Sequence, residues 1–213
     1  TATLFMPRSG PVSFDSLRGA AAVRAFFTAQ FADLLALVPD LETQFAEHPQ
    51  SGLATLHCWP WHTGNSLLIG DAAHAIVPFH GQGLNCGFED CVLLDRLLAQ
   101  HETAAAAFRE YESARRLDTD AIAQMALENY REMRDTVRRS DYAQRRELAL
   151  ELERRYPRHF IPRYSMVMFH AEISYSEALH RGQTQERVLD ALIAEGVSAD
   201  SERAAALIRD AGL

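Results

Sequence analysis

The feature that most constrains the fold is a long segment, residues 103–155, that contains neither glycine nor proline. This segment is rich in Ala, Glu, Arg and Leu, which have high intrinsic helix propensity. Because glycine and proline are the residues that most often interrupt regular structure, their absence predicts long helices here. Pro157 and Pro162 break the run, and apolar spacing predicts a further helix from Ser174 to about Ile193. The chain after residue 101 is therefore predicted to be all helical.

The first hundred residues have a different pattern, in which short apolar runs alternate with turns that contain Gly and Pro. Alternation and β-branched residues predict strands at Thr1–Met6, Gly52–Trp61 and Asn65–Gly70. Helical spacing predicts helices at Ala20–Leu37 and from about Leu84 to Gln100. We therefore expect an α/β (α+β) chain with a mixed first domain, residues 1–100, and a helical C-terminal domain, residues 101–213.

The composition excludes several classes of protein. Acidic residues outnumber basic ones by 29 to 21, for a net charge of −8, so a nucleic-acid partner is not expected. Three cysteines are too few for a disulfide framework, and no apolar run approaches the roughly 18 residues of a membrane span. The spacing of the histidines and cysteines fits no zinc pattern, so no metal site is expected. We expect a cytoplasmic protein without a transmembrane anchor.

The loop that follows Gly70 contains the residues most typical of a ligand-binding site. An apolar strand ends at Gly70, which places Asp71 at the carboxyl end of a strand, where ligands of a sheet usually bind. Gly81 and Gly83 lack side chains, so their backbone can approach a flat ligand closely. The helix that starts near Leu84 directs unpaired N–H groups and the positive end of its dipole at the same place. The sequence therefore predicts a binding site for a ligand with negative charge.

Two ligands suit such a loop. A reduced flavin carries negative charge near N1 and the C2 carbonyl, and a helix N-terminus would stabilise this charge. A phosphate would be stabilised by the same groups. Physical chemistry alone leaves both ligands open.

The residues Gly70-Asp71, Pro78 and Gly81-x-Gly83-x-Asn85 are similar to the second FAD motif of the flavin-dependent aromatic hydroxylases. In that family the Asp contacts the ribityl chain, and the loop from the Pro to the Asn lines the flavin ring. The resemblance implies FAD as cofactor and a flavin-hydroxylase fold. It implies these cofactor-binding residues: Gly70, Asp71, Pro78, Gly81, Gln82, Gly83, Leu84 and Asn85.

Further segments resemble the kynurenine 3-monooxygenase group of this family, namely Thr3–Pro7, His80–Cys91, Glu128–Arg134 and Phe160–Val167. This resemblance implies L-kynurenine, a small aromatic amino acid, as substrate, with the helical domain covering its pocket. The implied substrate-binding residues are Asn129, Met133, Tyr164, Phe79, His80, Thr3 and Phe5. Asn129 and Met133 lie four residues apart and share a helix face. Phe79 and His80 would lie at the junction of flavin and substrate.

The implied reaction is hydroxylation to 3-hydroxykynurenine, in which NADPH reduces FAD, O2 forms a C4a-hydroperoxyflavin, and one oxygen passes to the ring. The flavin performs this chemistry, so no protein side chain is expected to act as a catalyst. The Gly-x-Gly-x-x-Gly loop that binds the ADP part of FAD is absent from these residues. We therefore expect a fragment that requires the remaining N-terminal part of the same protein and is inactive alone.

Two alternatives stay open beside this interpretation. The chain could belong to a flavin hydroxylase for another small aromatic compound, although the segments of the helical domain argue against this. It could also be a non-catalytic binding fragment that has the flavin motif without the nucleotide fold. A screen of substrates and a test for bound flavin separate these alternatives.

Overall fold

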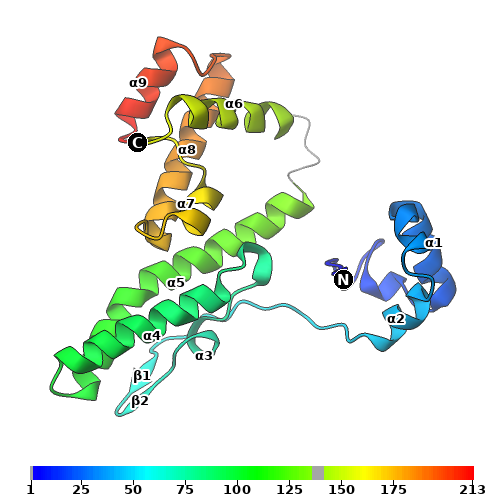
Figure 1. The fold of residues 1–213 in the computed structure, drawn as a ribbon, viewed down its shortest axis with the longest axis horizontal. Coiled ribbons are helices and arrows are strands. Elements are labelled where there is room, and N and C mark those ends of the chain that lie inside the picture. The colour runs from blue at the N-terminus through cyan, green and yellow to red at the C-terminus, as the bar shows by residue number, and fades with distance from the viewer. Residues whose placement is uncertain (1, 136–141) are drawn as a thin grey trace. The chain divides into compact units, whose positions relative to one another are not determined.

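The structure, a computed structural model, describes residues 2–135 and 142–213 (Figure 1). The chain divides into two compact units, Thr1–Gly52 and Leu53–Leu213. Each unit has its own hydrophobic core. The predicted division at residue 101 stays a prediction, and the helices on either side of that residue pack against each other in the second unit.

The first unit is a small helical cluster. Its elements are η1 (Phe14–Ser16), α1 (Ala20–Gln30), η2 (Ala32–Ala36) and α2 (Leu41–Glu47). The core is formed by the buried side chains of Leu17, Val23, Phe27 and Leu41. The helix predicted at residues 20–37 is confirmed in its first part. It ends at Phe31, whose backbone (φ −144°, ψ 52°) leaves the helical region, and a short 3₁₀ segment follows.

The predicted strands are largely wrong among the described residues. The structure contains one antiparallel hairpin, β1 (His62–Thr63) with β2 (Ser66–Leu67), and Leu68 N extends it by donating to Trp61 O over 2.8 Å. Residues 2–6 and 53–61 are extended without regular pairing, and Thr1 lies outside the described part. A strand requires regular hydrogen bonding to a neighbouring strand, and among the described residues these segments make only isolated backbone bonds, such as that from Leu56 N to Ala75 O over 2.8 Å. The α/β character predicted for residues 1–100 is therefore reduced to this hairpin.

The second unit includes the loop predicted to bind a ligand. It contains α3 (Asp71–His74), η3 (Pro78–His80), α4 (Gly83–Gln100) and α5 (Ala104–Arg134). Helices α4 and α5 lie side by side (Figure 1). A cluster of Trp61, Ala73, Leu97, Ala107 and Tyr111 fills the space between them and the hairpin. The predicted helix near 84–100 is confirmed.

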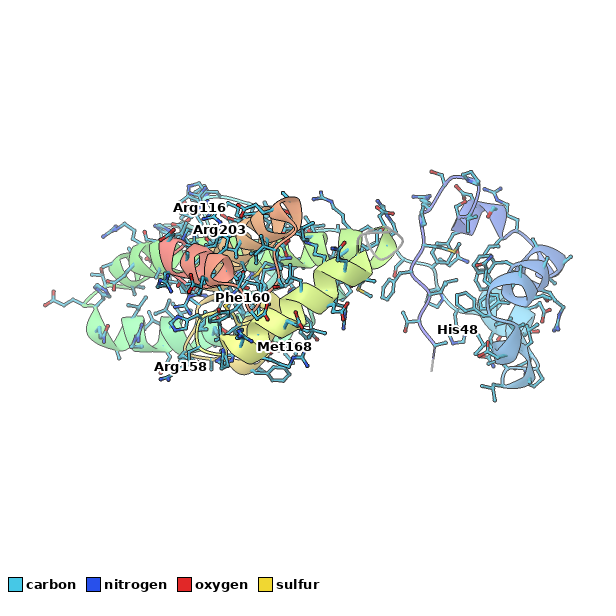
Figure 2. All side chains as sticks on the ribbon, turned by 90° about the horizontal axis from the view of Figure 1, so that it is seen from above. His48, Arg116, Arg158, Phe160, Met168 and Arg203 are labelled. Atoms are coloured by element: carbon cyan, nitrogen blue, oxygen red, sulfur yellow. The ribbon has the colours of Figure 1, made fainter. Side chains whose placement is uncertain are left out.

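The remaining helices form the C-terminal part of this unit: α6 (Tyr142–Arg155), α7 (Arg163–Phe169), α8 (Tyr175–Glu195) and α9 (Glu202–Asp210). The helical prediction for residues 103–155 is confirmed as α5 and α6, and residues 136–141 lie outside the described part. The core of α6, α8 and α9 includes Leu152, Leu192 and the buried Phe160 (Figure 2). Ser174 caps α8 through a bond from Glu177 N, and Gly196 ends it. Among the described residues, no helix is long and apolar enough to cross a membrane.

Candidate functional site

The loop of residues 70–83 contains the short helices α3 and η3 and leads into α4. Gly70 precedes α3 and has a φ of +57°, in the left-handed region that favours glycine. Asp71 is exposed in the first turn of α3. Pro78 begins the 3₁₀ turn η3, which ends at Gly81 with a φ of +69°. The two glycines therefore allow the chain to reverse its direction twice within a short distance.

The N-terminus of α4 faces this loop without a side-chain cap. Gln82 occupies the N-cap position but makes no capping hydrogen bond, and no acidic residue lies in the first turn. A Cβ added at Gly81 would meet nothing within 4 Å, and one at Gly83 would come no closer than 3.7 Å to a neighbour. The main chain at this point is thus open to a flat group, and the positive end of the helix dipole is not neutralised.

The side chain of Gln82 is buried among the helices instead. Its Nε2 donates to Met168 Sδ over 2.9 Å, and its Oε1 accepts from Asn85 Nδ2 over 2.9 Å and from Tyr175 over 3.3 Å. Met168 lies on α7 (Figure 2) and Tyr175 begins α8. A contact between Gln82 and a cofactor would therefore be made by its main chain.

A buried charged group holds the start of the loop. Asp90 on α4 is 0% exposed. Its Oδ2 accepts from Gly70 N over 3.0 Å and from His74 Nε2 over 2.6 Å. Its Oδ1 accepts from Nε of Arg115, on α5, over 2.7 Å. One carboxylate thus joins Gly70, α3, α4 and α5.

The electrostatics of this network follow from its partners. Burial acts to raise the pKa of Asp90, but the hydrogen bonds from His74 and Arg115 hold it below its usual range. Burial raises the pKa of the nearby Cys86 thiol to about 12. His74, Cys86 and Asp90 bring ligand atoms within 4.8 Å of one another. A cation there would meet the Arg115 guanidinium and a protonated thiol, so this cluster has the chemistry of an ion-pair network.

The end of the loop is held by α5. The amide of Asn129 donates to the carbonyl of Phe79. The Phe79 ring packs against Tyr130, with ring centroids 4.7 Å apart. Asn129 therefore fixes the main chain at the residue where flavin and substrate are expected to meet.

The next residue of the loop, His80, is covered by α7. It is 4% exposed, and its ring stacks on Tyr164 with centroids 5.3 Å apart. Burial and then the charge of Arg163 lower the pKa of His80. Arg163 is itself paired with Glu128 on α5. His80 is thus held in its neutral form.

The structure brings four of the seven predicted substrate residues into direct contact. A hydrogen bond joins Asn129 to Phe79, and ring stacking joins the next residue, His80, to Tyr164. Met133 lies in the last turn of α5 and is 58% exposed, and Leu84 is also exposed. Thr3 and Phe5 lie in the first unit, so their assignment to the pocket stays a prediction.

Comparison with known proteins first gives a class. A sequence model of the FAD binding domain matches residues 27–126. This region contains the whole loop, α4 and most of α5. The match supports FAD as cofactor, as the resemblance implied.

The particular relatives are named kynurenine 3-monooxygenase. That of Xanthomonas euvesicatoria pv. vesicatoria (strain 85-10) is 50% identical over 190 residues, which is 89% of this chain and 42% of the relative. Those of Stenotrophomonas maltophilia (strain K279a) and Myxococcus xanthus (strain DK1622) are 46% and 45% identical, over 94% and 98% of this chain. They are covered to 44% and 46% of their own lengths. The resemblance to this group is confirmed, and the chain spans less than half the length of these relatives.

Substitution of Asp90→Asn is expected to lower the free energy of unfolding by about 1–3 kcal/mol, because Arg115 and His74 lose a buried charged acceptor while Arg115 keeps its ion pair with Glu89. Urea unfolding of the purified protein measures the change. Asp95→Asn provides the control, since Asp95 lies on the same helix and is exposed. Equal stabilities of the two variants would contradict the role given to Asp90.

His80→Phe is expected to reduce the pH dependence of stability. A folded-state pKa below the unfolded value means that the unfolded state binds more protons, so stability is lost as pH falls from about 6.5 towards the folded pKa. Phenylalanine removes this loss. Melting temperatures between about pH 5 and pH 7 measure the effect. His180→Phe, at an exposed position on α8, should keep the wild-type dependence, and the same dependence in His80→Phe would show that His80 is not responsible.

Proposed function

We propose that this chain forms the flavin-ring and substrate-pocket part of an FAD-dependent, NADPH-consuming monooxygenase that converts L-kynurenine to 3-hydroxykynurenine. The observation that carries the proposal is the uncapped N-terminus of α4 beside the open backbone of Gly81 and Gly83. It occurs inside a region matched by the FAD binding domain and in a chain similar to kynurenine 3-monooxygenases.

The residues fit a flavin ring. Main-chain N–H groups at the start of α4 can donate to the negative charge that forms near N1 when the ring is reduced. The exposed carboxylate of Asp71 follows Gly70, where it can accept hydrogen bonds from ribityl hydroxyls. FAD, when bound, supplies the activation of O2 and the oxygen that is transferred. The chain positions the ring and excludes water.

The substrate residues fit an aromatic amino acid. Phe79, Tyr130, His80 and Tyr164 place four rings around the end of the loop. Met133 and Tyr164 are about half exposed, at 58% and 51%, so their side chains remain accessible to a ligand. An aniline ring can pack on aromatic and thioether groups, and the Tyr164 hydroxyl can bond the amino-acid head. Since His80 is buried and stacks on Tyr164, we assign it a packing role.

We also propose that the active protein contains a further part that binds the ADP half of FAD. One support is the length of the relatives, of which this chain covers less than half. Another is the outer face of α4, where Leu84, Phe88 and Val92 are exposed at a spacing of four residues. Such an apolar stripe is normally covered in a folded protein. The isolated chain is therefore expected to bind FAD weakly and to be inactive.

The proposal predicts that the full-length, FAD-loaded protein oxidises NADPH faster when L-kynurenine is present, and that the product is heavier by one oxygen. Absorbance of NADPH and mass spectrometry of the product measure this. If the protein contains flavin but kynurenine does not change its rate of NADPH oxidation, the substrate is another small aromatic compound. Protein purified without flavin, and unable to take it up, would overturn the flavin site itself.

Tyr164→Phe should weaken kynurenine binding about fivefold to tenfold, because one hydrogen bond is lost while the ring that stacks on His80 remains. The KM should rise and kcat should change little. Tyr156→Phe, at a half-buried position that packs against the core of α6, α8 and α9, serves as control. Wild-type affinity in Tyr164→Phe would count against a contact between this hydroxyl and the substrate.

A further inference from the structure

A glycine in the middle of α8 lies against the start of α7. Gly182 is buried, seven residues after the first residue of the helix. A Cβ added there would lie 2.6 Å from Cδ, 2.9 Å from Cγ and 3.1 Å from Cβ of Arg163. Glycine is unfavourable inside a helix compared with alanine. Its φ is in the ordinary range, so the backbone does not require glycine here, and the close approach of Arg163 is the feature that does.

Arg163 connects this contact to the candidate site. It is the first residue of α7, and its guanidinium pairs with Glu128 on α5. Glu128 precedes Asn129, which holds the loop at Phe79. Tyr164 follows Arg163 and stacks on His80. The first carbon atoms of the Arg163 side chain thus fix the start of α7, the helix that covers the loop.

We propose that Gly182 is a positioning residue: the space left by its missing side chain seats Arg163 and thereby sets the place of Tyr164 over His80. The contact includes Cβ of Arg163, which no change of side-chain rotamer can move, besides Cγ and Cδ. Met166, fully buried one turn further along, anchors the rest of α7. An added methyl group at residue 182 must therefore displace the start of α7.

The functional consequence rests on the proposed kynurenine pocket. A small displacement of a positioning group can reduce the efficiency of an enzyme up to about a hundredfold. We expect Gly182→Ala to raise the KM for L-kynurenine about tenfold, with kcat within about threefold of wild type. The full-length, FAD-loaded protein is used for this measurement.

The matched control is Gly87→Ala. Gly87 also lies inside a helix, but a Cβ added there meets nothing within 4 Å. The change in helix propensity is the same in both variants. Because the Cβ at residue 87 makes no close contact, the expected KM of Gly87→Ala is within about twofold of wild type. A KM that rises equally in both variants would overturn the proposal.

A double-mutant cycle tests whether Arg163 transmits the effect. Arg163→Ala removes Cγ and Cδ, so the two closest contacts with a Cβ at residue 182 disappear. In that background, Gly182→Ala should change the KM less than twofold, and an undiminished effect would exclude Arg163 as the link. If Gly182→Ala alone is insoluble, recovery of soluble protein in the double variant supports the proposal, and continued insolubility contradicts it.

A second measurement separates this inference from the proposed activity. The NMR titration of the His80 ring depends on the burial of the ring, which stacks on Tyr164, and on the distance of the Arg163 charge, and it needs no substrate. The His80 pKa should shift in Gly182→Ala and stay unchanged in Gly87→Ala. If the His80 pKa shifts in Gly182→Ala but the protein shows no response to kynurenine, the positioning role of Gly182 stands and the proposed substrate is wrong. If the His80 pKa does not shift, the positioning role is wrong.

Discussion

The fully buried carboxylate of Asp90 is the group on which the arrangement of the loop depends. A charge in the protein interior is tolerated only when it is paired and hydrogen-bonded, and Asp90 meets this requirement through Gly70, His74 and Arg115. These partners lie at the end of the hairpin, on α3 and on α5. Satisfying one carboxylate therefore orders four segments at once, and the loop of residues 70–83 begins from a fixed point.

The helices could be predicted from the sequence because their signals are local. The run without Gly or Pro gave α5 and α6, and apolar spacing gave α4 and α8, to within a few residues. The strands could not be predicted in the same way. Residues 53–61 have the composition of a strand, but pairing depends on a neighbour that local sequence does not specify. Only the hairpin, whose two strands are joined by a tight turn at Gly64 and Asn65, forms in the described residues.

The candidate site shows the same division between local and distant information. The motif from Gly70 to Asn85 is contiguous and was recognisable as a flavin loop. The bonds that hold it, from Arg115 to Asp90 and from Asn129 to Phe79, join residues 25 and 50 positions apart. One signal was available for the first bond: Asp90 lies on the same face of α4 as the buried Cys86 and Leu97, where an unpaired charge would be unfavourable. The bonds of the Gln82 side chain to α7 and α8, and the contact between Arg163 and Gly182, left no comparable signal in the sequence.

The side chain of Gln82 has a consequence for how ligands would affect one another. Gln82 lies in the loop at the N-cap of α4, and its side chain bonds residues of α7 and α8. A ligand that stabilises one position of α7 would therefore change the affinity of the loop for its own ligand. A ligand bound at the loop would change the affinity for the ligand at α7 by the same factor. Such reciprocity is a thermodynamic requirement for two sites that share an element. The effect of a ring under α7 on binding at α4, and the effect of a ring at α4 on binding under α7, would then measure the same coupling free energy.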